Sequence, residues 1–147
     1  MTALFLKPAR NLTPLWFTVA ALGGVAWNLF GAVQFAGSVT ATEASLIASG
    51  MTPEQAAVMT GYPFWMTLAF AVGVSGGLVG SIFLLLRKSA AMSVLLTSLI
   101  GYVALWIGDM VHGVFAALGA PQVIILTTVV AIAALLFALS RHPAAKD

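Results

Sequence analysis

Residues 90–118, AAMSVLLTSLIGYVALWIGDMVHGVFAAL, decide the fold of this chain, because they form a long apolar run that a single acid interrupts. A membrane-spanning helix needs roughly 20 predominantly apolar residues, and this run is longer than that. Asp109 lies inside the run, and His112 follows three residues later. A carboxyl group in hydrocarbon costs roughly 2.5–3.5 kcal/mol on insertion scales. The run therefore predicts a membrane span whose acid has a partner, a hydrated cavity or a functional role.

The composition of the whole chain agrees with a lipid environment. Its 147 residues are 61% hydrophobic and only 7% charged, whereas an average soluble domain has about 25% charged residues. The formal net charge is +2, and the six Lys/Arg are too scattered to form a nucleic-acid patch, so we expect no nucleic-acid partner. The chain has no cysteine, which excludes disulfides, thiolate metal sites and thiol catalysis.

Four apolar segments are long enough to cross a bilayer, which predicts an all-α bundle of four transmembrane helices in one domain, residues 1–147. The predicted spans are residues 15–37, 64–86, 90–118 and 123–140, and residues 38–63 form an outer loop. In this loop Thr52 and Gln55 fit a capping box, which predicts a short helix through Met59. The expected topology is up-down-up-down.

The basic residues predict the orientation of this bundle. All six fall on one side of the predicted spans and none falls in the outer loop; they are Lys7, Arg10, Arg87, Lys88, Arg141 and Lys146. The positive-inside rule makes that side cytoplasmic. Both termini are therefore expected in the cytoplasm.

The second predicted span carries two interleaved GxxxG patterns, formed by Gly73 with Gly77 and by Gly76 with Gly80. Small residues four positions apart let two helix backbones approach closely in a membrane. These glycines therefore predict a helix-packing face. The pattern leaves open whether the partner helix belongs to this chain or to a second copy.

Polar and aromatic side chains recur at spacings of three or four along the third predicted span, at Tyr102, Trp106, Asp109 and His112. This spacing puts them on one helix face and lets Asp109 pair with His112. The first span offers Trp27, Asn28 and Gln34 as a complementary face. We therefore predict one outward-opening polar pocket between spans one and three, with Trp27 and Trp106 as its walls.

Two interpretations of this constellation stay open. In one, Asp109 and His112 neutralise each other and bond to Asn28, which only holds the helices together. In the other they form a functional site for a polar solute, in which the carboxyl and the imidazole exchange a proton. Two ligands three residues apart are too few for a metal, and His142 lies on the opposite side, so no metal and no haem or other cofactor is predicted.

Several stretches carry a family resemblance. They are WNLFGAVQF at 27–35, MTPEQAA at 51–57, AFAVGV at 69–74 leading to Gly80–Ser81, and Gly108–Asp109. Together they resemble a largely uncharacterised set of small four-span proteobacterial membrane proteins, some of which carry the automatic label "sugar transporter". The resemblance covers nearly the whole chain and implies a bacterial inner-membrane location. SemiSWEET-type sugar transporters differ, because they have three spans and a Pro-Gln motif within a helix, so their binding residues are not carried over.

These observations favour a small transporter or permease for a polar solute, with a sugar and proton coupling as hypotheses. The competing hypothesis is a non-catalytic accessory subunit of a larger membrane complex. No catalytic motif is present, so we do not expect an enzyme. Because four helices enclose little volume, a homodimer that meets at the glycine face of span two is also predicted.

Overall fold

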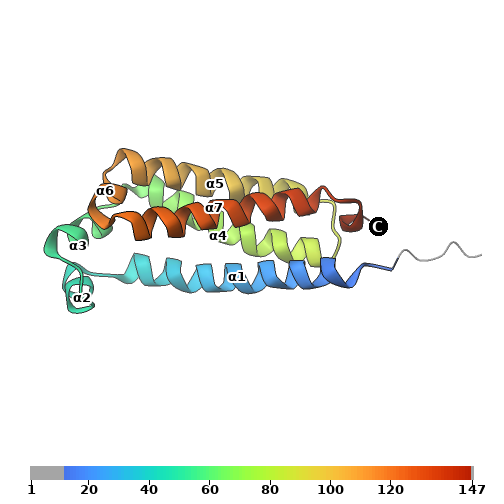
Figure 1. The fold of residues 1–147 in the computed structure, drawn as a ribbon, viewed down its shortest axis with the longest axis horizontal. Coiled ribbons are helices and arrows are strands. Elements are labelled where there is room, and N and C mark those ends of the chain that lie inside the picture. The colour runs from blue at the N-terminus through green and yellow to red at the C-terminus, as the bar shows by residue number, and fades with distance from the viewer. Residues whose placement is uncertain (1–11, 147) are drawn as a thin grey trace, which may run out of the picture.

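The computed structural model describes residues 12–146, so Lys7 and Arg10 lie outside the described part of the chain. All regular secondary structure in this part is helical (Figure 1). Its elements are α1 (Leu15–Thr40), α2 (Glu43–Ala48), α3 (Pro53–Thr60), α4 (Phe64–Leu85), α5 (Ala91–Val111), α6 (Val114–Leu118), α7 (Ala120–Ser140) and a short 3-10 turn, η1 (Pro143–Ala145). The four long helices α1, α4, α5 and α7 are each long and apolar enough to cross a membrane. The predicted fold class is confirmed.

The long helices pack in sequence order, α1 on α4, α4 on α5, and α5 on α7. Figure 1 shows an elongated bundle with α2, α3 and α6 gathered at one end, which we call the loop end (residues 41–63 and 112–119). The opposite end, called the tail end, holds the α4–α5 turn and the residues after α7. Helices α1 and α7, the first and the last in this order, have few contacts with each other.

The predicted glycine face packs within the chain. A Cβ atom on Gly73 would lie 2.7 Å from the Tyr102 ring, and one on Gly80 would lie 2.6 Å from the Leu95 side chain, so both glycines face α5. Gly76 also faces α5, with Ser98 as its nearest neighbour, and Gly77 faces α1. The packing role is confirmed. These glycines are occupied by contacts within the chain, and the homodimer itself stays a prediction.

The third predicted span is shorter than the apolar run of residues 90–118. Helix α5 stops at Val111, because Gly113 adopts the left-handed conformation with φ 74°. The chain then forms the separate helix α6 and turns at Gly119, with φ 75°, into α7. The expected continuous helix over 90–118 is therefore wrong at its end. An apolar run shows where a helix is favourable, but a left-handed glycine decides where it ends.

The loop end is built from two short capped helices. The predicted capping box is present at α3, where Thr52 and Gln55 bond reciprocally to each other's backbone. Thr42 and Ser45 form a second capping box at α2. The Gln55 side chain also donates to the Ala117 carbonyl at 3.2 Å, which ties α3 to α6. The outer loop is thus a folded cap and not a loose connector.

The tail end brings together basic residues from two parts of the chain. Arg87, in the turn after α4, donates to the carbonyls of Ala144 and Lys146. Ala145 is buried in a core cluster that includes Phe17. The described part of the chain therefore places the α4–α5 turn and the C-terminal segment at one end, as the distribution of basic residues predicted.

Candidate functional site

A cavity of about 420 Å³ lies in the half of the bundle nearest the loop end. All four long helices contribute to its lining. The main lining side chains are Trp27, Phe30, Gln34 and Ser38 from α1, Thr67 and Phe70 from α4, Tyr102, Leu105 and Asp109 from α5, and Gln122, Ile125, Leu126 and Val129 from α7. Thr60 at the end of α3 and Tyr62 in the following turn close the cavity toward the loop end.

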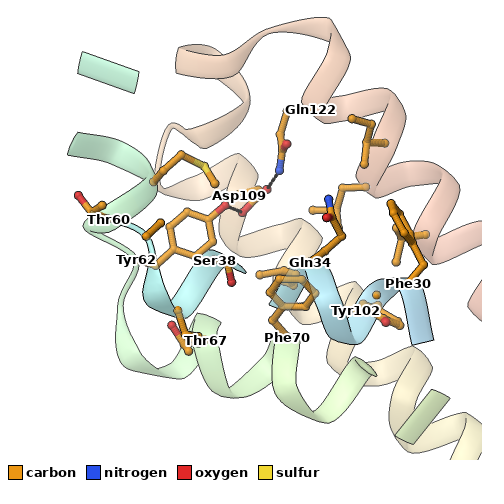
Figure 2. A pocket seen from close by; sticks show the side chains of 18 of the residues that line it. Phe30, Gln34, Ser38, Thr60, Tyr62, Thr67, Phe70, Tyr102, Asp109 and Gln122 are labelled. Carbon is orange, nitrogen blue, oxygen red and sulfur yellow. Dashed lines mark hydrogen bonds between the residues drawn. The ribbon is translucent and has the colours of Figure 1, made fainter. Parts of the chain in front are cut away.

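Asp109 is the anchor of this site. Its side chain has no exposed surface, and both carboxylate oxygens accept a hydrogen bond. The Tyr62 hydroxyl donates to Oδ1 at 2.9 Å, and the Gln122 Nε2 amide donates to Oδ2 at 2.9 Å. Figure 2 shows the two side chains converging on Asp109 from different elements. The carboxyl group therefore joins α5 to the α3–α4 turn and to the first turn of α7.

An ionised carboxylate can accept both of these hydrogen bonds. Both partners of the carboxylate are neutral groups. Burial, and after it the charge of Asp109 and the hydrogen bond to it, raises the pKa of Tyr62, so its phenol remains a protonated donor at neutral pH. Among the described residues that line the cavity there is no Lys, Arg or His.

Helices α1 and α7 both line the cavity but have few contacts with each other. At the tail end these helices meet, since a Cβ on Gly24 would lie 2.7 Å from the Leu136 side chain. The lining residues at the edge of the cavity are outward-facing, with Phe30 on α1 56% exposed and Ile125 on α7 61% exposed.

Four of the seven predicted pocket residues meet at this cavity, namely Trp27, Gln34, Tyr102 and Asp109. Tyr102 is buried and closes the floor against Gly73. Gln34 is exposed on the α1 side of the cavity. All four spans line the cavity, whereas the sequence predicted a pocket between spans one and three.

The other three predicted residues lie elsewhere. His112 follows the end of α5, is exposed, and has its ring centroid 5.9 Å from that of Trp65. It makes no hydrogen bond to Asp109, whose partners are Tyr62 and Gln122, so the predicted Asp109–His112 pair is wrong.

Asn28 and Trp106 have structural contacts instead. Buried Asn28 donates to the Gly24 carbonyl at 2.8 Å and, at 3.5 Å, to the Ser81 hydroxyl, which fastens α1 to α4. It does not bond to Asp109. Trp106 donates from Nε1 to the Thr127 hydroxyl at 3.0 Å and so joins α5 to α7 outside the cavity. It is not a cavity wall.

The two partners of Asp109 were not included among the predicted site residues. Gln122 is a polar residue at the very start of an apolar span, which is a detectable signal. Tyr62 precedes Phe64 and Trp65, and this aromatic cluster is typical of a membrane-interface belt. Because an interface tyrosine and a tyrosine that turns inward have the same sequence signature, the pattern alone could not assign its contact with Asp109.

The fold and the site together define a small multi-pass helical membrane protein with a cavity that contains one buried acid, Asp109. The chain matches no protein-family model, no curated protein and no solved structure. The function is therefore inferred from the geometry of the cavity.

Proposed function

We propose that this chain is a small transporter or permease-like protein that binds a small polar solute in the cavity beside Asp109. The observation that supports this best is the cavity of about 420 Å³ among four apolar helices. Binding pockets for small molecules have volumes of roughly 300–1,000 Å³. Protein interiors are otherwise close-packed, so a bundle with only a structural role would be expected to fill this space.

The placement of polar groups also favours binding. Gln34, Thr67 and Gln122 reach the same cavity from three different helices. Ionisable residues inside membrane spans usually face a cavity or a pathway, and Asp109 lies at the end of this one. In this proposal Asp109 is the only ionisable group retained from the predicted pair, because His112 is exposed outside the cavity. Proton coupling, if it operates, then depends on Asp109.

The competing hypothesis is an accessory subunit of a larger membrane complex. It needed an open face of small residues for docking, and the glycines predicted for that face pack against α1 and α5. The described surface of α1 is instead covered by large apolar side chains such as Leu22, Leu29 and Val33, as expected for contact with lipid. The cavity is therefore the stronger basis for a function.

For location, we propose a bacterial inner membrane with both termini in the cytoplasm. The six basic residues and the positive-inside rule support this orientation, and the resemblance to four-span proteobacterial proteins supports the membrane. The loop end then faces outward, and the cavity lies in the outer half of the membrane.

Thermal unfolding of the detergent-purified protein tests the proposal. Wild type and Asp109→Asn would be heated from pH 5 to pH 8 with sugars, amines, amino acids and other small solutes. At least one solute should raise the unfolding temperature of wild type and have less effect on the variant. His112→Gln is the matched control and should respond like wild type. A folded wild type that responds to no solute would contradict a binding role.

A further inference from the structure

The charge of the cavity restricts what it can hold. Its lining contains one acid and, among the described residues, no basic side chain. Both hydrogen-bond partners of the carboxylate are neutral, so no side chain among the described lining residues balances a negative charge on it. A buried carboxylate is stabilised by a nearby positive charge, and the interaction is stronger in an apolar environment than in water. An anionic ligand is disfavoured for the same reason.

The walls of the cavity favour a cation with an apolar body. Five aromatic side chains line it: Trp27, Phe30, Tyr62, Phe70 and Tyr102. Aromatic faces attract organic cations by their quadrupole, and cages of such rings bind quaternary ammonium groups. Leu105, Leu126 and Val129 add aliphatic surface. A sugar would leave much of this apolar surface without a matching partner.

The opening of the cavity lies where a membrane-dissolved ligand could enter. We infer that this opening is the gap between α1 and α7, because these helices have few contacts with each other and their lining side chains Phe30 and Ile125 are exposed. Both residues belong to helices that are long and apolar enough to span the membrane. A ligand that partitions into hydrocarbon can therefore reach the cavity sideways without passing through the folded cap of α2 and α3.

We propose that the cavity binds a lipophilic organic cation, which enters from the membrane between α1 and α7 and is held by the aromatic walls near the Asp109 carboxylate. The proposal rests on the proposed solute-binding role of this cavity, but it replaces the small polar solute with a lipophilic cation. Because Asp109 has no exposed surface, the cation lies over Tyr62 and Gln122 and interacts with the carboxylate across them.

Protons should oppose this binding. A proton on Asp109 removes the negative charge that favours the cation, and by reciprocity the cation favours release of that proton. The other titratable groups near the site are Tyr62 and Tyr102 in the cavity lining and His112 just beyond α5. The remaining polar groups that line it from α1, α4 and α7 include Gln34, Thr67 and Gln122, which do not titrate. Asp109 is thus the group that links binding to pH.

Calorimetric binding of tetraphenylphosphonium to the full chain in lipid nanodiscs tests the proposal, with empty nanodiscs as the blank. Tetraphenylborate has nearly the same shape and the opposite charge, and glucose represents a neutral polar solute. Wild type should bind the phosphonium ion more weakly as the pH falls from 8 to 5, and should bind the borate ion at least tenfold more weakly than the phosphonium ion.

Two variants and one control locate the binding site. Asp109→Asn should bind the phosphonium ion at least tenfold more weakly and without pH dependence. Ile125→Trp, which narrows the opening and leaves the carboxylate in place, should slow or prevent binding. Glu54→Gln removes an exposed acid from α3 and should bind like wild type.

The outcomes separate this inference from the proposed function. If glucose binds in an Asp109-dependent way and the phosphonium ion does not, the inference is overturned and a polar-solute carrier stands. Equal binding of the phosphonium and borate ions would also overturn the inference, because it would show that charge has no role. If no probe binds folded wild type, the inference is overturned, and the broader solute panel then decides the proposed function.

Discussion

Asp109 is held by side chains that lie far from it in the sequence. Tyr62 and Gln122 each bind one carboxylate oxygen at 2.9 Å, and the carboxyl group is fully buried. A buried carboxylate with good donors is tolerated, whereas removing one donor leaves much of its desolvation cost uncompensated. The two hydrogen bonds therefore account for how an acid can remain inside an apolar bundle.

Replacing Tyr62 by phenylalanine should destabilise the protein by about 1–3 kcal/mol, because the buried carboxylate loses one of its two donors. The measurement is equilibrium unfolding in mixed micelles, followed by circular dichroism. His112→Gln is the comparison, since this exposed side chain should change the free energy of unfolding by no more than about 0.5 kcal/mol. A larger loss from His112→Gln than from Tyr62→Phe would revive the predicted Asp109–His112 pair.

Helical spacing explains which predicted site residues meet. With 3.6 residues per turn, positions seven apart differ by only about 20° around the helix. Trp27 and Gln34 have this spacing, as do Tyr102 and Asp109, and all four line the cavity. Asn28 lies about 120° away from Gln34 around α1 and faces Ser81 on α4. The angular position of a residue around its helix therefore predicts whether it lines the cavity better than its polarity does.

At the scale of helices, hydropathy predicted all four spans but not the end of the third one. The long helices α4 and α7 end close to the predicted positions. The third span does not, because Gly113 adopts a left-handed conformation that hydropathy cannot detect. His112 precedes Gly113 and still bonds through its backbone N–H to the Gly108 carbonyl, so the helix end does not explain the missing pair. The pair is absent because Tyr62 and Gln122 bind the two carboxylate oxygens of Asp109.

Helix packing through the glycines gives a prediction at the same scale. An alanine at Gly77 would put its Cβ 2.0 Å from Oδ1 of Asn28, which is buried and bonded to Ser81. Gly77→Ala should therefore lower the free energy of unfolding by about 1–3 kcal/mol.

Gly23→Ala is the matched control, because a Cβ there meets nothing within 4 Å. It should be neutral or stabilising by up to about 1 kcal/mol, since alanine favours a helix over glycine. Unfolding curves of the two variants measured side by side check both values. Equal effects would show that Gly77 is not closely packed.

For the whole molecule, the order of helix packing creates the cavity. Helices α1 and α7 occupy the two ends of the packing order and have few contacts with each other, one of them where Gly24 faces Leu136 toward the tail end. Both helices line the cavity near the loop end. The sequence could not predict this arrangement, because four spans of similar hydropathy allow several neighbour orders with the same loops.

The orientation of the whole bundle is open to a labelling test. The chain has no cysteine, so single cysteines can be placed without a background signal. In intact bacterial cells, a membrane-impermeant maleimide should label Ser49→Cys at the loop end and should not label Lys88→Cys at the tail end. Labelling of Lys88→Cys in intact cells and of Ser49→Cys only after lysis would reverse the proposed orientation.

Solute flux into proteoliposomes tests most directly whether the Asp109 cavity carries solute across the membrane. Wild type, Asp109→Asn and the control Glu54→Gln would be reconstituted at equal density, and uptake of a solute that stabilises wild type would be followed across an imposed pH gradient. Wild type and Glu54→Gln should accumulate the solute, and Asp109→Asn should resemble empty liposomes. Equal accumulation by Asp109→Asn and wild type, or none above empty liposomes for wild type, would contradict transport through this cavity.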